Sequence, residues 1–381
     1  MSYHQKNKNP PTAVRRIEKP SYKLDRSKLI RFNRNDTVFK RVKSDQSWAG
    51  YEHMYDEKVP AILKLRKPGY SRIDFALASA SWIVHDSYEG AFSREKIKLF
   101  RIPEDTVGFD WTKTKLEIDD PHKMNMIVKR AARLFGASLT GICRLNKDWL
   151  YADAEVSEGI KNSIVMAVEM DIEGIGTSPA VPAAAATGIG YSRMAFTLAC
   201  VAEFIRNLGY QAIQCGNDTA LSIPLAVDAG LGELGRNGLL LTPEFGPRIR
   251  LCKILTDIPL EPDKPIEFGV EAFCTKCKLC AKKCEANAIS MTDKPNFNPA
   301  SSSNSPGVLK WYVNPELCYQ FWCKNGIDCS TCIRVCPYNI ASARKARVSP
   351  EQFWNCCAPA LDVEQTATRL FSSKKRQTKK D

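Results

Sequence analysis

The stretch Cys274-Thr-Lys-Cys277-Lys-Leu-Cys280-Ala-Lys-Lys-Cys284 decides the fold of the C-terminal part of this chain. Its C-x2-C-x2-C-x3-C spacing wraps three thiolates around one [4Fe–4S] cube and sends the fourth to a second cube. The second cube needs its own ligands, and these follow in Cys329-Ser-Thr-Cys332-Ile-Arg-Val-Cys336-Pro337, with Cys318 eleven residues ahead of Cys329. The sequence therefore predicts a ferredoxin-like module that holds two clusters and transfers electrons.

The crossover typical of two-cluster ferredoxins divides the eight cysteines into two sets of four. The first set is Cys274, Cys277, Cys280 and Cys336, and the second is Cys284, Cys318, Cys329 and Cys332. Cys323 is an alternative to Cys318 as the eighth ligand. Two structural zinc sites are the competing explanation, but zinc uses cysteine pairs separated by a dozen or so residues and does not need four cysteines in so short a stretch.

The composition is that of a soluble globular protein of one large domain or two smaller ones, with 381 residues, 44% hydrophobic and 25% charged. The net charge of +13 is concentrated at the two ends. Residues 1–44 hold thirteen Lys or Arg against three acids, and the tail from Lys374 to Asp381 holds five against one. Because the body between them is about neutral, we expect no nucleic-acid partner; the ends suit solvated arms or contacts with an anionic membrane surface or an acidic electron donor.

Targeting features are absent from the sequence. No stretch approaches the ~20 apolar residues that cross a bilayer, and the twin arginine Arg15-Arg16 has no apolar run behind it. With no export signal in this chain, we expect a cytoplasmic protein or, if a signal was removed, one that is peripheral on the outer face of the cytoplasmic membrane.

The pattern along the chain predicts four parts. Residues 1–60 form an extended basic N-terminal arm, 61–265 the catalytic domain, 266–346 the two-cluster domain, and 347–381 a C-terminal segment with a basic tail. Helical periodicity from Met124 to Phe135 and over Ser192–Leu208 alternates with expected strands, which cover Ala137–Leu145, Ser163–Met170 and Tyr210–Cys215. This alternation predicts an α/β core sheet covered by helices.

Two glycine-bearing stretches suit close approach of the backbone to a large ligand. One is Ala183–Gly190, and the other contains Gly230, Gly232, Gly235 and Gly238. The second stretch matches G-x-G-x-x-G, but it follows the helical pattern of Ala220–Ala229 rather than a strand. It therefore fails the context test for a dinucleotide fingerprint.

From Arg31-Phe32 onward the chain resembles the corrinoid-dependent reductive dehalogenases of organohalide respiration. The resemblance rests on Arg31-Phe-Asn-Arg-Asn-Asp-Thr-Val-Phe39, Ala131-Ala-Arg-Leu-Phe-Gly-Ala-Ser138, Gly190-Tyr191-Ser192, Gly216-Asn-Asp218, Ala229-Gly-Leu-Gly-Glu-Leu-Gly-Arg-Asn-Gly238, Phe245-Gly-Pro-Arg-Ile-Arg250 and both cysteine blocks. Phe321-Trp322 and Gly326 also match, and they favour Cys318 over Cys323 as the cluster ligand.

The resemblance implies an α/β (α+β) protein: a nitroreductase-like corrinoid-binding core over 61–265 and a C-terminal ferredoxin-like module with two [4Fe–4S] clusters. The implied function is replacement of a halogen by hydrogen. The corrinoid is expected to be cobalamin-type and bound base-off, because none of the four histidines lies in an Asp-x-His-x-x-Gly loop. The implied partners are an organohalide, a low-potential electron donor and, as a candidate, a small membrane anchor protein.

Carried over by motif, Tyr191 is the expected proton donor, Arg250 its cationic partner, and Asn217 a third residue of the catalytic pocket. Thr187 and the four glycines Gly230, Gly232, Gly235 and Gly238 are expected to bind the corrinoid. A tight helix–loop joint is the alternative role for the glycines. Without the resemblance, Tyr191 would be a packed core aromatic, Arg250 a surface or salt-bridged arginine, and Asn217 part of a turn with Gly216. A guanidinium beside a phenol suits proton donation because it stabilises the phenolate that remains.

Two alternatives belong to other functional classes. An epoxyqueuosine reductase uses the same cofactors on a tRNA base, but the short stretch after Trp354 leaves no room for the helical-repeat domain that usually follows the cluster motifs in such enzymes. A non-catalytic ferredoxin-like electron carrier would not need Tyr191, Asn217 and Arg250. Retention of a corrinoid would separate the carrier from both enzymes.

Overall fold

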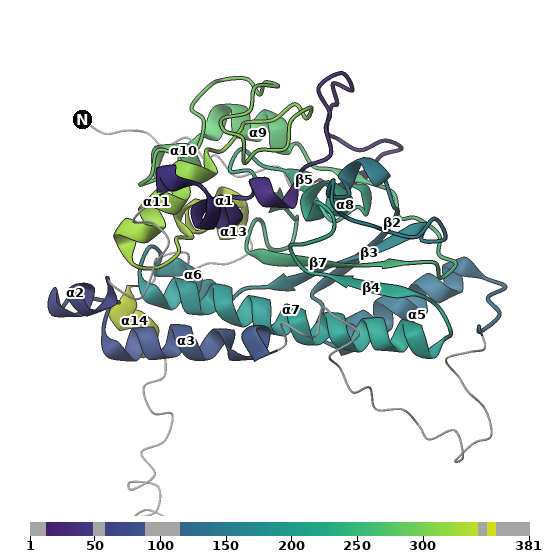
Figure 1. Cartoon of the computed structure of the whole chain (residues 1–381), viewed down its shortest axis with the longest axis horizontal. Helices are drawn as coiled ribbons and strands as arrows, with labels where there is room; N and C mark the ends of the chain where they lie inside the picture. The colour runs from purple at the N-terminus through teal and green to yellow at the C-terminus, as the bar shows by residue number, and fades with distance from the viewer. Residues whose placement is uncertain (1–12, 49–57, 88–114, 342–348, 356–381) are drawn as a thin grey trace, which may run out of the picture.

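The computed structural model describes residues 13–48, 58–87, 115–341 and 349–355, and a four-stranded sheet lies at its centre (Figure 1). The strand order is β2-β3-β7-β4, and all three pairings are antiparallel. The strands are β2 (Leu139–Arg144), β3 (Asn162–Glu169), β7 (Ile249–Thr256) and β4 (Ala212–Cys215). The three predicted strands are confirmed, and the antiparallel pairing makes the core α+β.

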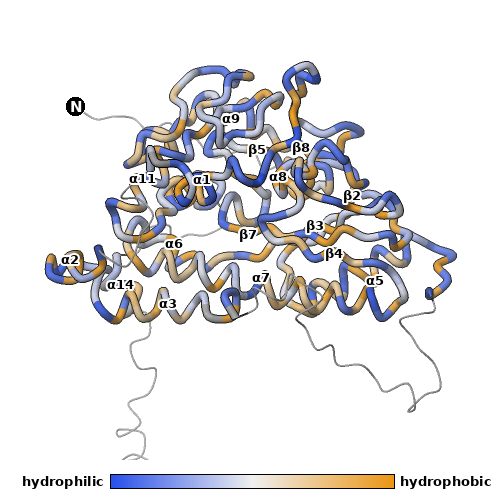
Figure 2. Tube along the Cα trace, viewed as in Figure 1, coloured by the Kyte–Doolittle hydropathy of each residue, from blue (hydrophilic) through white to orange (hydrophobic). Residues whose placement is uncertain are grey.

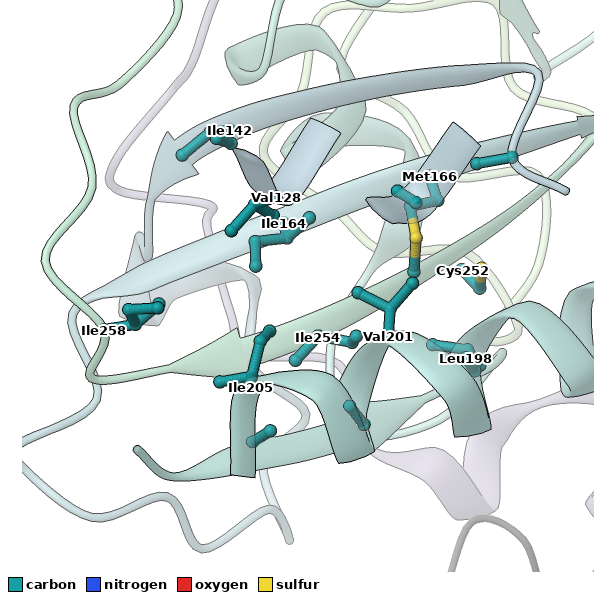
Figure 3. Packing of buried hydrophobic residues seen from close by; sticks show 14 of the residues in the cluster. Val128, Ile142, Ile164, Met166, Leu198, Val201, Ile205, Cys252, Ile254 and Ile258 are labelled. Carbon is teal, nitrogen blue, oxygen red and sulfur yellow. The ribbon is translucent and has the colours of Figure 1, made fainter. Parts of the chain in front are cut away.

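The central strand β3 is buried on both faces. Ile164 and Met166 pack toward α5 (Pro121–Leu134) and α7 (Val181–Asn207), as Figure 3 shows for Val128, Leu198 and Ile205. Val165 and Ala167 face the other way, toward α8 (Ser222–Asp228). Because successive side chains of a strand alternate between the faces, a continuous apolar run fits a strand covered on both sides. Apolar residues accordingly concentrate in the central strands and along α7 (Figure 2).

The helix α7 begins earlier than predicted. Periodicity indicated Ser192–Leu208, whereas the helix starts at Val181 with Pro182 in its first turn, where proline is tolerated. The small residues of Ala183–Gly190 are therefore helical. At Gly188 a Cβ atom would collide with Trp82 of α3 (Arg72–Ser87), so this glycine permits close helix packing and not the approach of a ligand, which corrects that prediction.

The N-terminal arm is less extended than predicted. The strand β1 (Arg15–Arg16) pairs with β8 (Ile266–Glu267), and the helix α1 (Val38–Ser44) follows. Val38 and Val42 pack against Tyr319 of α11 (Pro315–Asn325). The sequence did not reveal α1 because two turns are too short for a helical period to stand out.

The two-cluster module lies beyond one end of the sheet, on the same side as α8 (Figure 1). Its helices are α9 (Val270–Cys277), α10 (Leu279–Lys282), α11, α12 (Thr331–Arg334) and α13 (Pro337–Ala341). The other elements are η1 (Arg34–Asp36), η2 (Gln46–Trp48), α2 (Val59–Lys64), η4 (Lys147–Trp149), α6 (Ile172–Gly176), β5 (Glu233–Leu234), β6 (Leu240–Leu241) and α14 (Pro350–Asn355). None of the helices within the described ranges combines the length and the apolar character that a bilayer crossing needs. The basic tail from Lys374 lies outside these ranges.

Candidate functional site

The three residues predicted to be catalytic meet at one point of the core. Tyr191 lies on α7, Asn217 follows β4, and Arg250 is the second residue of β7. The Asn217 amide nitrogen donates a hydrogen bond of 2.8 Å to the Tyr191 hydroxyl oxygen. The Arg250 guanidinium carbon lies 4.8 Å from the centre of the Tyr191 ring, within the range of a cation–π contact.

Two neighbours on α7 hold the Arg250 side chain. Gly190 leaves space for it, because a Cβ atom there would lie only 3.1 Å from Arg250 Cγ. One turn before Tyr191, the Thr187 hydroxyl accepts a hydrogen bond of 3.1 Å from Arg250 Nη2. The Arg250 Nε atom is buried and has no hydrogen-bond partner among the described residues, so one donor of the cation stays unused at the site.

A carboxyl group from the cluster module completes this arrangement. The Thr187 hydroxyl also hydrogen-bonds to Asp328, the residue before Cys329. Burial raises the pKa of the Asp328 carboxyl to about 6, while Arg250 and the Thr187 hydrogen bond act in the opposite direction. A continuous set of polar contacts therefore connects the second cysteine set to Tyr191. Sequence reasoning missed Asp328, which no motif marks.

The helix α3 covers Tyr191 with two aromatic side chains. Trp82 stacks on the tyrosine ring at 4.9 Å with an interplanar angle of 24°, and His85 meets it edge-on at 5.5 Å. From the sequence, Trp82, Trp111, Trp149 and Trp311 could shape either the substrate pocket or the core, and no signal marked His85. Of the other tryptophans considered, Trp149 and Trp311 are buried, and Trp111 lies outside the described residues.

A cavity of about 790 Å³ opens between the core, the N-terminal arm and the module. Asn217 lines it, so the cavity reaches the residue that holds Tyr191. Phe32, Trp149 and Tyr151 form an aromatic part of its wall, and Gly238 lines it as well. The volume greatly exceeds that of a small organic substrate and suits a large cofactor.

Of the predicted corrinoid-binding residues, Gly238 lines this cavity and the other four lie elsewhere. Gly230 and Gly232 pack closely against the backbone carbonyls of Lys264 and Leu241, and Gly235 lies against the side chains of Asn237 and Leu241. Thr187 holds Arg250 and Asp328. Direct corrinoid contact by these five residues stays a prediction.

The structure brings the four cysteines of the first set together around one small pocket. Burial raises the pKa of the Cys280 thiol to about 12, and the neighbouring Cys274 and Cys277 add to the shift. Burial likewise raises the pKa of Cys336, with Cys274 and Cys280 as the next contributors among the cysteines. Thiols in such surroundings ionise when bound iron supplies positive charge, so the four sulfur atoms suit one cluster.

The second set assembles in the same way. Burial raises the pKa of Cys318 to about 12, followed by the effects of Cys329 and Cys284. Burial raises the pKa of Cys332 well above its usual value, and Cys318, Cys329, Cys280 of the first set and Cys284 add to the shift. Cys323 is instead fully buried in the apolar contact between α11 and the arm. The arrangement favours Cys318 as the eighth ligand.

Unused hydrogen-bond donors surround the first set. Arg236 is 1% exposed and donates to the backbone oxygen of Cys274 at 3.0 Å, yet its Nη2 atom has no partner among the described residues. The buried Tyr338 hydroxyl, beside Cys274 and Cys336, is likewise without a partner there. Such donors fit the sulfur atoms of a cluster. Within the described ranges, no three His, Cys, Asp or Glu side chains are grouped closely enough to hold a single metal ion.

A cavity-bearing α+β core joined to two sets of four cysteines defines an iron–sulfur protein with a large second binding site. Residues 156–260 match the family model "Reductive dehalogenase subunit", and residues 273–340 match a 4Fe-4S dicluster domain. A tetrachloroethene reductive dehalogenase of Sulfurospirillum multivorans is 33% identical over 368 residues, which cover 83% of this chain and 73% of that protein. The chain belongs to the reductive dehalogenase family and carries two [4Fe–4S] clusters.

Other relatives define the extent of the similarity. A tetrachloroethene reductive dehalogenase of Desulfitobacterium hafniense is 35% identical over 345 residues, and the match covers 71% of this chain but 63% of that protein's length. A solved reductive dehalogenase, described as suggesting a mechanism for B12-dependent dehalogenation, shares the fold with a TM-score of 0.63 at 24% identity, over 89% of this chain and 47% of that one. An epoxyqueuosine reductase of Listeria monocytogenes is 33% identical, but over 31% of this chain.

Proposed function

We propose that the protein is a reductive dehalogenase that replaces a halogen of an organohalide by hydrogen. The overall reaction consumes two electrons and one proton: R–X + 2e⁻ + H⁺ gives R–H + X⁻. The observation that carries the proposal is the contact of Tyr191 with Asn217 and Arg250 beside a large cavity. A proton source held next to a cation is what the reaction requires of the protein.

Tyr191 is the proposed proton donor. Because its oxygen accepts a hydrogen bond from Asn217, its own O–H proton is free to point toward a substrate. After donation, the Asn217 amide and the Arg250 guanidinium both stabilise the phenolate. Trp82 and His85 keep the ring in place from the side of α3.

A cobalamin-type corrinoid is the proposed second cofactor. Support comes from the family, from the cavity volume, and from Asn217, which both lines the cavity and contacts Tyr191. When bound, the corrinoid supplies the low-potential cobalt centre at which the carbon–halogen bond is broken. Its base-off binding and the nitroreductase-like character of the core remain predictions.

The two clusters are proposed to deliver single electrons to this site. The contacts from Asp328 through Thr187 to Arg250 support the proposal, because they bring the second cysteine set next to the catalytic residues. The remaining proposals concern partners and location. They are a low-potential electron donor, a candidate membrane anchor protein, and a cytoplasmic or peripheral membrane position.

Replacing Tyr191 by phenylalanine tests the function. The ring keeps its packing against Trp82 and Arg250 and loses only the acid, so dehalogenation should fall by roughly 10²–10⁴-fold. The measurement is halide release from a panel of organohalides under an artificial low-potential reductant, with iron and corrinoid content determined in parallel. Tyr210→Phe is the matched control, because the Tyr210 hydroxyl donates to the Leu116 carbonyl away from the site.

We expect Tyr191→Phe to keep its clusters and corrinoid, and Tyr210→Phe to keep its activity. Wild-type turnover by Tyr191→Phe would assign the proton to another source. A wild-type protein that holds both cofactors and releases no halide from any substrate would instead favour the epoxyqueuosine reductase reading, which a tRNA stem-loop substrate would then test.

A further inference from the structure

Positive charge lines the large cavity without any counterpart of opposite sign. The described residues that line it include Arg34, Lys40, Lys43 and Lys310, and none of them is Asp or Glu. The first three come from the arm and are exposed, so water screens them. Lys310 belongs to the loop between the two cysteine blocks, and its side chain lies in a less hydrated position.

The Lys310 ammonium has no anionic partner. Its nitrogen lies 4.7 Å from the centre of the Tyr312 ring, and among the described residues it forms no ion pair or side-chain hydrogen bond. Burial lowers the pKa of Lys310 to about 8. A partly buried cation without an anionic partner is a position at which an anionic ligand can bind favourably.

The buried Lys253 shows how the fold satisfies a lysine that has a structural role. Lys253 is fully buried, and its ammonium donates to the Gly216 carbonyl at 2.6 Å and to the Ser222 hydroxyl at 3.1 Å. The protein therefore satisfies that ammonium internally. Lys310 has no comparable acceptors, although the backbone that carries it is fixed by pairing with Asn296.

The wall around Lys310 also offers neutral polar groups. Ser303, Asn304 and Ser305 line the cavity from the preceding part of the loop. The Asn304 side chain is fixed, since its oxygen accepts from the Ala300 and Ser301 backbone and its nitrogen donates to the Val313 carbonyl. A fixed loop with hydroxyl groups and one desolvated ammonium suits a phosphate ester.

We propose that Lys310 binds the phosphodiester of the nucleotide loop of a complete corrinoid, with Arg34, Lys40 and Lys43 attracting the same group from the rim. The inference rests on the proposed corrinoid cofactor. The side chains of the corrin ring are amides, whereas the nucleotide loop of the same cofactor carries one full negative charge. Lys310 thereby selects corrinoids that have this loop over those that lack it.

Corrinoid titrations of the cluster-loaded, corrinoid-free protein test the proposal. The two probes are cobalamin and cobinamide, which has the same ring and amide side chains but no nucleotide loop. Loss of one charge-assisted hydrogen bond should weaken cobalamin binding by Lys310→Met about tenfold to hundredfold and leave cobinamide binding unchanged. Lys310→Arg should retain most of the cobalamin affinity. Lys294→Gln, an exposed lysine of the same module away from the cavity lining, is the control.

Thermal stability supplies a readout that a structural lysine would not give. Without corrinoid, Lys310→Met should melt at the wild-type temperature or above it, because an unpaired desolvated charge is removed. With cobalamin bound, Lys310→Met should melt below the wild type, because the wild type gains more stability from binding the cofactor. Equal loss of affinity for both corrinoids, or unchanged affinity for cobalamin, would overturn the assignment of Lys310. Failure of the wild-type protein to bind either probe would overturn the proposed cofactor itself, and the two failures are therefore distinguishable.

Discussion

The environment of Tyr191 depends on the neighbouring Gly190, which has no side chain. Gly190 brings the Arg250 stem close to α7, so that the guanidinium can lie over the tyrosine ring and still reach Thr187. Arginine suits this position because its planar cation can stack on a ring and donate hydrogen bonds from its edge at the same time. The geometry of the site therefore depends as much on the space at Gly190 as on the charge at Arg250.

Cys318 and Cys323 provide a comparison of two cysteines on the same helix. Cys318→Ala should lower the iron content from about eight to about four atoms per chain, because one cluster loses a ligand. Cys323→Ala should keep the iron and lower thermal stability, since it empties space between α11 and the arm. Iron and sulfide analysis of anaerobically reconstituted protein measures both effects. Equal iron in the two variants would contradict the assignment.

The residues of the site differ in how visible they are in the sequence. The cysteine sets follow from spacing, and Tyr191, Asn217 and Arg250 follow from motif resemblance. Asp328 and His85 could not be predicted, because each reaches the site through contacts between segments far apart in the chain. The role of the glycines was also hidden, since a glycine that faces a ligand and one that faces a neighbouring backbone look alike in sequence.

At the scale of elements, a helix or strand that is buried on all sides is difficult to predict from the sequence pattern. The first ten residues of α7 are almost entirely buried and small, so they show no alternation between an apolar and a polar face. The strand β7 escaped prediction for a related reason. Lys253 lies fully buried in its centre and interrupts the apolar pattern, although Gly216 and Ser222 satisfy its charge.

The arm is fastened to the core by a buried carboxyl group. The Tyr22 hydroxyl donates to Asp228 at 2.6 Å, and the Trp149 indole donates to the same carboxyl group at 3.2 Å. Burial raises the pKa of Asp228 from 3.8 to about 6, against the effect of both hydrogen bonds. Tyr22 and Trp149 both line the cavity, so this contact also shapes the cofactor site.

This contact makes stability depend on pH with a defined sign. Below about pH 4 the Asp228 carboxyl is protonated in both the folded and the unfolded chain. Between about pH 4 and 6, Asp228 is ionised in the unfolded chain but still protonated in the folded one. The free energy of unfolding therefore falls as pH rises through this range, and above about pH 6 it falls no further. Asp228→Asn lacks this titration. When the pH is raised from 5 to 8, the free energy of unfolding of Asp228→Asn should therefore increase by roughly 1 kcal/mol relative to that of the wild type.

Thermal melting of the two proteins at both pH values, under anaerobic conditions, measures this difference. Asp148→Asn is the control, because Asp148 forms an ion pair with Arg26 in which both side chains are more than a third exposed. A constant difference between Asp228→Asn and the wild type at the two pH values would show that Asp228 does not carry the dependence.

At the scale of the molecule, two buried arginines join the core to the cluster module. Arg248 donates to the Asn339 side chain at 2.9 Å. Arg236 donates to the backbone oxygens of Cys274, Ser290 and Thr292. The glycine-rich stretch that contains Arg236 therefore serves as a joint between the two parts, which explains why all four of its glycines lie against protein backbone or side chains.

Arg236 also lies close enough to the first cysteine set for its charge to affect the reduction potential of a cluster held there. Its charge interacts with Cys280, Cys274 and Cys277, all from the first set. A nearby cation stabilises the reduced, more negative form of a cluster and so raises its reduction potential. Arg236→Gln should lower the potential of the cluster held by the first set by on the order of 50 mV, while Arg236→Lys should retain most of it.

An EPR-monitored redox titration resolves this effect within a single molecule, because the second cluster serves as an internal control. The cysteines of the second set are not among the groups that act on Arg236, so the potential of their cluster should move much less. A general loosening of the joint between core and module would change the surroundings of both clusters, and both potentials would then shift together. Equal shifts in Arg236→Gln would thus refute a local electrostatic role for Arg236. A selective shift would show that the charge of Arg236, supplied by the core, raises the potential of the cluster held by the first set alone.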